Sequence, residues 1–88
     1  MMQTVRYSDE CKWQQSDDGF QMEFVDRDGE KLAEVALVNF ESKLWKFEAF
    51  LPEKYHLDGR NPTGVVYSSA AAKRVAELIL LNTILVRA

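Results

Sequence analysis

Three residue types that act together in nucleophilic catalysis occur in this chain: a thiol at Cys11, an imidazole at His56 and a carboxylate at Asp58. In such sites the histidine takes the thiol proton and the carboxylate orients the histidine. Cys11 is far from the other two in sequence, and no local motif surrounds it. We therefore interpret Cys11 as a half-buried structural thiol and His56 as a loop histidine, and we expect no enzymatic activity.

Carboxylates are frequent, but their spacing does not predict a metal site. The run from Asp26 to Glu30 is similar to the start of a calcium loop, yet it lacks the later ligands and the closing glutamate. One cysteine and one histidine are too few for a transition-metal site within one chain. The four glycines form no phosphate-binding loop. We expect neither a metal nor a cofactor.

Basic side chains from three segments could instead contact the phosphates of a nucleic acid. They are Lys46, Lys54, Arg60, Lys73 and Arg74. They would form one basic edge if the third hairpin, the 52–67 loop and the helix start converged. Interleaved acids and a net charge of −3 weaken the field of such an edge. Nucleic-acid binding is therefore the alternative function.

The segment from Ser69 to Ala88 has no Gly or Pro and many strong helix formers, so it predicts one long helix. Ser68 or Ser69 suits the N-cap. At about 100° per residue, one side of the helix is apolar and should cover a sheet. That side contains Ala71, Ala72, Val75, Leu78, Ile79, Leu85 and Val86.

The other side of this helix carries Leu80, Leu81 and Ile84, which a sheet on the first side cannot reach. Burying each is worth about 1.5 to 3 kcal/mol, a large amount for an 88-residue chain. We expect a second copy to cover these three residues in a two-fold homodimer. Alternatively, the N-terminal segment folds over them. Asn82 should lie buried on the sheet-facing side, bonded to a strand carbonyl or fixing a seam between two helices.

Upstream of the helix, residues alternate between apolar and polar in three segments, 20–25, 32–38 and 44–51. The turns before and between them, two of which contain Asp-Gly, predict an antiparallel meander. Residues 12–15 extend it, and residues 4–7 form an edge strand or an arm. The 52–67 loop ends in 65–67, which adds a short strand or packs on the helix.

The predicted fold is therefore α+β: an antiparallel β-meander of three to four strands packed against one long C-terminal helix, in one domain spanning residues 1–88. Apolar residues at 47% and charged residues at 28% are typical of a globular protein. The apolar run 78–81 is too short to span a bilayer, and no signal peptide is evident. We expect a cytoplasmic protein.

Two resemblances extend this interpretation. The meander and the helix start from Ser69 to Leu78 resemble the second half of a double-stranded RNA-binding domain, in which lysines at the helix start contact phosphates. Lys73 and Arg74 stand in comparable places, with alanines ahead of them.

A second pattern is similar to small proteins of bacteriophages and prophages. It comprises Trp45, Gly59, Ser69, Lys73-Arg74 and Ala76-Glu77-Leu78. This resemblance implies an accessory protein of the bacterial cytoplasm. The leading hypothesis is a non-enzymatic, homodimeric module that binds a host or phage protein through the sheet edge or the 52–67 loop.

Overall fold

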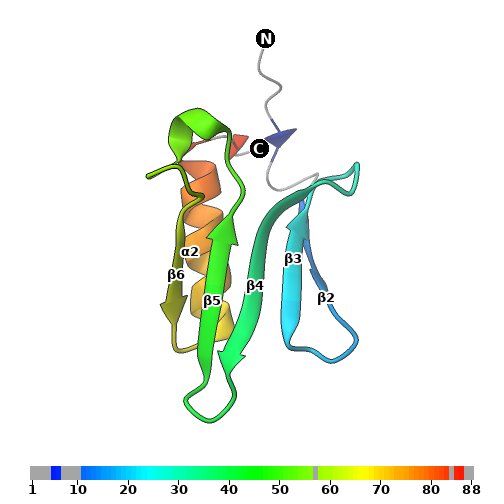
Figure 1. Ribbon diagram of the computed structural model, residues 1–88. Coiled ribbons are helices and arrows are strands. Elements are labelled where there is room, and N and C mark those ends of the chain that lie inside the picture. The colour runs from blue at the N-terminus through cyan, green and yellow to red at the C-terminus, as the bar shows by residue number, and fades with distance from the viewer. Residues whose placement is uncertain (1–4, 7–10, 57, 84, 87–88) are drawn as a thin grey trace.

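A computed structural model describes residues 5–6, 11–56, 58–83 and 85–86. Five antiparallel strands form a sheet in which each strand pairs with its neighbours in sequence, and one helix covers one face (Figure 1). The strands are β2 (Lys12–Gln15), β3 (Gln21–Val25), β4 (Lys31–Asn39), β5 (Leu44–Ala49) and β6 (Thr63–Val66); the helix is α2 (Ser69–Leu81). A short 3₁₀ helix, η1 (Glu53–Tyr55), lies in the loop before β6. The predicted α+β meander with a C-terminal helix is confirmed.

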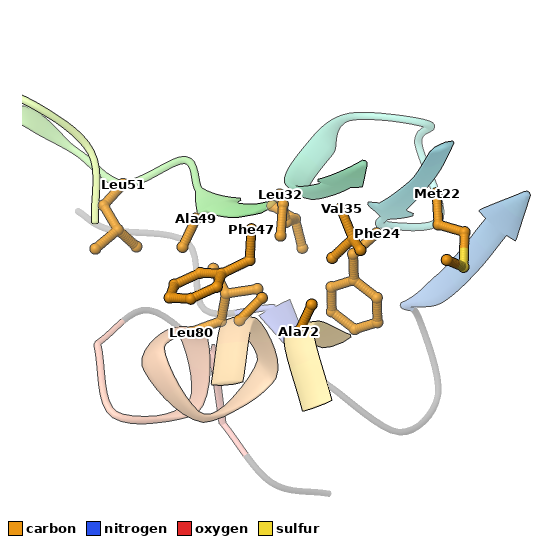
Figure 2. Packing of buried hydrophobic residues seen from close by; sticks show 11 residues of the cluster. Met22, Phe24, Leu32, Val35, Phe47, Ala49, Leu51, Ala72 and Leu80 are labelled. Carbon is orange, nitrogen blue, oxygen red and sulfur yellow. The ribbon is translucent and has the colours of Figure 1, made fainter. Parts of the chain in front are cut away.

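The hydrophobic core lies between the sheet and α2, where alternate residues of the central strands point toward the helix (Figure 2). Met22 pairs with Val35, and Val35 pairs with Phe47, so one cross-strand row supplies the centre of the core. Val35 and Ala49 have no exposed surface. The alternation that predicted these strands therefore also predicted their buried faces.

The two Asp-Gly turns are tied by aspartate side chains. Asp18 Oδ1 accepts hydrogen bonds from Ser16 Oγ at 2.6 Å and from Phe20 N at 2.9 Å. Asp26 Oδ1 accepts from Asp28 N and from Glu30 N, both at 2.9 Å. Gly19 and Gly29 adopt positive φ angles of 75° and 81°, which glycine allows without strain. The run from Asp26 to Glu30 is thus a hairpin turn, as expected.

Helix α2 begins as predicted, because Ser68 Oγ accepts a hydrogen bond from Ala71 N at 3.0 Å. Its predicted end at Ala88 is wrong, because the helix stops at Leu81 with Asn82 as the C-cap. Thr83 Oγ1 then donates to Ile79 O at 2.7 Å. Asn82 is exposed, which contradicts the predicted buried amide.

Beyond the helix, β7 (Leu85–Val86) pairs in parallel with β1 (Val5–Arg6). Of the two alternatives for residues 4–7, the strand is therefore correct at residues 5–6. The sequence pattern predicts that Leu85 and Val86 lie on the sheet-facing side of the helix. Because these two residues lie beyond the end of the helix, including them shifted the predicted buried face away from the observed one.

The buried face of α2 is formed by Ala72, Ala76 and Leu80, each 0% exposed. These residues are four apart, and the two alanines allow the helix backbone to approach the sheet. The predicted positions of Leu78 and Leu80 were therefore interchanged: Leu80 is in the core, whereas Leu78 is 40% exposed.

A side-chain contact joins the far edge of the sheet to the helix. Trp13 in β2 donates from Nε1 to Glu77 Oε1 at 2.6 Å. The Trp13 ring also packs on Phe24, with 4.9 Å between ring centroids. Because Glu77 is bonded to β2, its side of the helix faces that edge of the sheet.

Candidate functional site

Six large apolar side chains of the described residues are exposed. They are Phe20, Val38, Phe40, Val65, Tyr67 and Leu78. Five of them fall into two groups, and Leu78 stands apart on helix α2. We call Phe20, Val38 and Phe40 the turn patch, and Val65 and Tyr67 the β6 strip.

The turn patch is built by two adjacent hairpin turns, both at the lower end of the sheet in Figure 1. Phe20 precedes β3 and Phe40 follows β4, and their rings meet edge to face with 6.0 Å between centroids. Lys43 Nζ lies 5.0 Å from the Phe40 ring centroid. Phe40 is 64% exposed and Phe20 is 46% exposed. Two aromatic rings beside a cation thus form an exposed surface held by the sheet.

Sequence reasoning missed this patch because it placed Phe20 on the buried face of a strand. Phe20 instead lies in the turn before β3, while α2 packs mainly on β4, β5 and β6. Phe40 had been assigned to a turn. The feature of the sequence that could have indicated the patch is Phe40, an aromatic residue within the otherwise polar turn 39–43.

The β6 strip follows the edge of the sheet opposite β2. Strand β6 pairs with β5 on one side, and Val65 is 56% exposed. Tyr67, which follows the strand, is 77% exposed. Val65 pairs with Lys46, so its side chain lies on the open face of the sheet. Leu78, in contrast, lies on the outward side of α2, about 200° from the buried Ala76. The strip therefore lies along the strand edge, apart from Leu78 on the helix.

The three residues predicted to form the dimer contact differ in their exposure and in whether the structure describes them. Leu80 has no exposed surface, because it packs in the core of its own chain, so it offers nothing to a second copy. Leu81 is half-buried and packs against the core from the side. Ile84 lies outside the described residues. A dimer contact at Leu81 stays a prediction.

Lys46 is separated from the two basic residues at the start of the helix. Lys46 alternates with Phe47 and so lies on the open face of the sheet, whereas Lys73 and Arg74 belong to the helix on the other face. Lys54 lies over the Tyr55 ring, 5.0 Å from its centroid. The single basic edge expected from the sequence is therefore divided between two faces.

The open face of the sheet is crossed by a row of three glutamates, since Glu23 pairs with Glu34 and Glu34 pairs with Glu48. Lys31 Nζ lies 2.7 Å from Glu23 and 3.5 Å from Glu34. The hydrogen bond with Glu23 raises the pKa of Lys31 above its ordinary value. Three carboxylates in register would repel a phosphate backbone. The open face does not favour nucleic-acid binding.

The residues considered for catalysis have structural contacts. His56 Nε2 lies 2.9 Å from Leu51 O, and this hydrogen bond fastens the loop to the end of the core. Cys11 is half-buried and packs against the hydrophobic core. Among the described residues, no three His, Cys, Asp or Glu side chains are grouped so that they could hold a metal ion.

No model of a known protein family matches the chain, and neither a curated protein nor a solved structure matches it. In the part of the chain that the structure describes, no helix has the length and hydropathy needed to cross a membrane. The geometry of the two exposed apolar groups is therefore the basis for assigning a function.

Proposed function

We propose that this chain is a non-enzymatic protein-interaction module that acts as a homodimer. The observation that carries the proposal is the arrangement of its exposed apolar side chains in two groups, the turn patch and the β6 strip. Clustered apolar surface on a small globular protein is characteristic of protein contacts. Two separate groups allow one contact with a second copy and another with a different protein.

The turn patch suits the different protein. Its Phe20 and Phe40 rings are rigid anchors, and Lys43 beside them adds a charge for orientation. Aromatic side chains contribute much of the binding energy at protein interfaces. In keeping with the resemblance to small phage and prophage proteins, the partner would be a host or phage protein in the bacterial cytoplasm.

Sedimentation velocity over a concentration range from 1 to about 100 μM tests the homodimer. The expected result is a species of twice the 10.1 kDa chain mass that gives way to monomer on dilution. A monomer at every concentration would overturn the proposed function. The double variant Phe20→Ser, Phe40→Ser should keep the dimer mass, because the turn patch is reserved for the other protein.

A further inference from the structure

We propose that two copies pair along β6, antiparallel and edge to edge, so that the two five-stranded sheets become one continuous sheet. This inference rests on the proposed homodimer and specifies its contact. The outward backbone groups of β6 and the absence of charge on this strand carry the argument.

The backbone of β6 has bonding groups available on its outer side. Ala49 N donates to Pro62 O at 3.0 Å, which sets the alternation between β5 and β6. Gly64 and Val66 therefore exchange hydrogen bonds with β5, whereas the N–H and C=O groups of Thr63 and Val65 point outward. A strand edge of this kind is a template for another strand.

The edge also lacks the usual protection against pairing. Natural edge strands are commonly blocked by a charged side chain, and β2 at the other edge carries Lys12. Strand β6 reads Thr-Gly-Val-Val and has no charge, in a chain that is 28% charged. A second copy brings a net charge of −3, so an uncharged strip is where two copies meet with least repulsion.

When two β6 strands pair, the outward N–H and C=O groups of each copy form hydrogen bonds with those of the other. With Gly64 of both copies on the two-fold axis, Thr63 of each copy lies opposite Val65 of the other, and the outward N–H and C=O groups bond in both directions. A Cβ on Gly64 would lie 2.9 Å from Cε2 and Cζ of Phe47, so the Phe47 ring already covers this position. Because Gly64 has no side chain, the two copies of this residue can approach each other at the axis without a clash on the helix-facing side.

The helices lie on one face of the joined sheet. A two-fold axis perpendicular to the sheet keeps both α2 helices on the same face, one on each side of the axis. Because Glu77 is bonded to Trp13 in β2, the opposite flank faces the axis. At 100° per residue this flank carries Val75 and Ile79, which are half-buried against the core. Leu78 lies on the outward side of the helix, about 200° from the buried Ala76, so the proposed contact is formed by the strand edges.

Proline substitutions test the edge. Val65→Pro removes an outward N–H without removing a bond to β5, and it should weaken dimerisation by about tenfold or more, since two symmetric hydrogen bonds are lost. Gln15→Pro is the matched control: Ser16 N donates to Gln21 O, so the N–H of Gln15 also points outward, at the β2 edge. This control should leave the dimer unchanged in sedimentation velocity.

Disulfide cross-linking tests the register and does not depend on how well the proline variant folds. In a Cys11→Ser background, Thr63→Cys and Val65→Cys proteins are mixed and oxidised with copper phenanthroline. The mixture should give several-fold more cross-linked dimer than either variant alone. Cross-linking that is no greater in the mixture overturns the arrangement.

The outcomes separate the two proposals. A wild-type dimer that Val65→Pro leaves intact, or that Gln15→Pro dissociates, overturns the β6 pairing while the homodimer stands. A monomeric wild-type protein overturns both the homodimer and the β6 pairing. This holds even if the monomer binds an extended peptide along β6. A dimer lost in Val65→Pro, with far-ultraviolet circular dichroism unchanged and Gln15→Pro unaffected, supports the pairing.

Discussion

Trp13 and Glu77 are 64 residues apart in the chain, yet a 2.6 Å hydrogen bond from the indole Nε1 to the carboxylate joins them. Strand β2 is an edge strand, and α2 packs mainly on β4, β5 and β6. Trp13 therefore spans the region between β2 and the helix, with its ring on Phe24. This contact ties the edge of the sheet to the helix layer.

Trp13→Phe removes the indole donor and leaves a ring to pack on Phe24. We expect a loss of about 1 to 3 kcal/mol in the free energy of unfolding, because a hydrogen bond to a charged acceptor is lost. Urea denaturation measures it. Glu77→Gln retains an acceptor and should lose less than Trp13→Phe. An equal loss in Glu77→Leu and Glu77→Gln would show that the hydrogen bond is not what matters.

Leu80 and Leu78 test which face of α2 is buried. Leu80→Ala leaves a cavity in the core and should cost about 2 to 5 kcal/mol of unfolding free energy. Leu78→Ala should cost about 0.5 kcal/mol or less in the monomer, because Leu78 is exposed there. Urea denaturation below the dimer dissociation constant compares them. The reverse order would contradict the observed face.

Gly64 and Phe47 form a coupled pair. Gly64→Ala forces a methyl group against the Phe47 ring, where a Cβ would lie 2.9 Å from two ring atoms. We expect a loss of about 1 to 3 kcal/mol from overpacking. Phe47→Leu should relieve part of this loss, so a double-mutant cycle by thermal or urea denaturation should give a favourable coupling. Additive effects would show that the methyl group is accommodated elsewhere.

The stability of the first Asp-Gly turn should depend on pH through the ionisation of Asp18. The hydrogen bond from Ser16 Oγ, followed by that from Phe20 N, lowers the pKa of Asp18 below its ordinary value of 3.8. A lowered folded pKa means that the ionised carboxylate stabilises the turn above pH 3.8. This contribution disappears as the pH falls through the folded pKa.

Carbon-13 NMR titration of the side chain measures the midpoint directly. Ser16→Ala should move the midpoint up toward 3.8, because it removes the largest cause of the lowering. A midpoint that is identical in wild type and Ser16→Ala would contradict the role of this hydroxyl.

The meander was predictable because its determinants are local. Alternation identified the buried faces that contain Met22, Val35 and Phe47, and the Asp-Gly turns set the hairpins. The end of the helix was not predictable in this way. Residues from Thr83 onward suit a helix or a strand, and the choice depends on pairing between β7 and β1 at the far end of the chain.

The site was harder to predict than the fold. In the sequence-based prediction, Lys46 and Lys73 lie on one basic edge. In the structure Lys46 lies on the open face of the sheet, because its neighbour Phe47 points into the core, whereas Lys73 lies on the helix that covers the other face. Assigning Leu80 to an interface failed because helix faces were averaged over residues beyond Leu81. The turn patch requires knowledge of where α2 lies on the sheet, which local patterns do not contain.

Strands β1 and β7 lie side by side in parallel, so the first and last described strands of the chain meet. A short peptide joining β7 to β1 would close the described strands into a ring, and a new opening could be cut at the exposed turn between β4 and β5. We therefore expect such a permutant to keep the same pairs of neighbouring strands, with a different starting point for ribosomal synthesis.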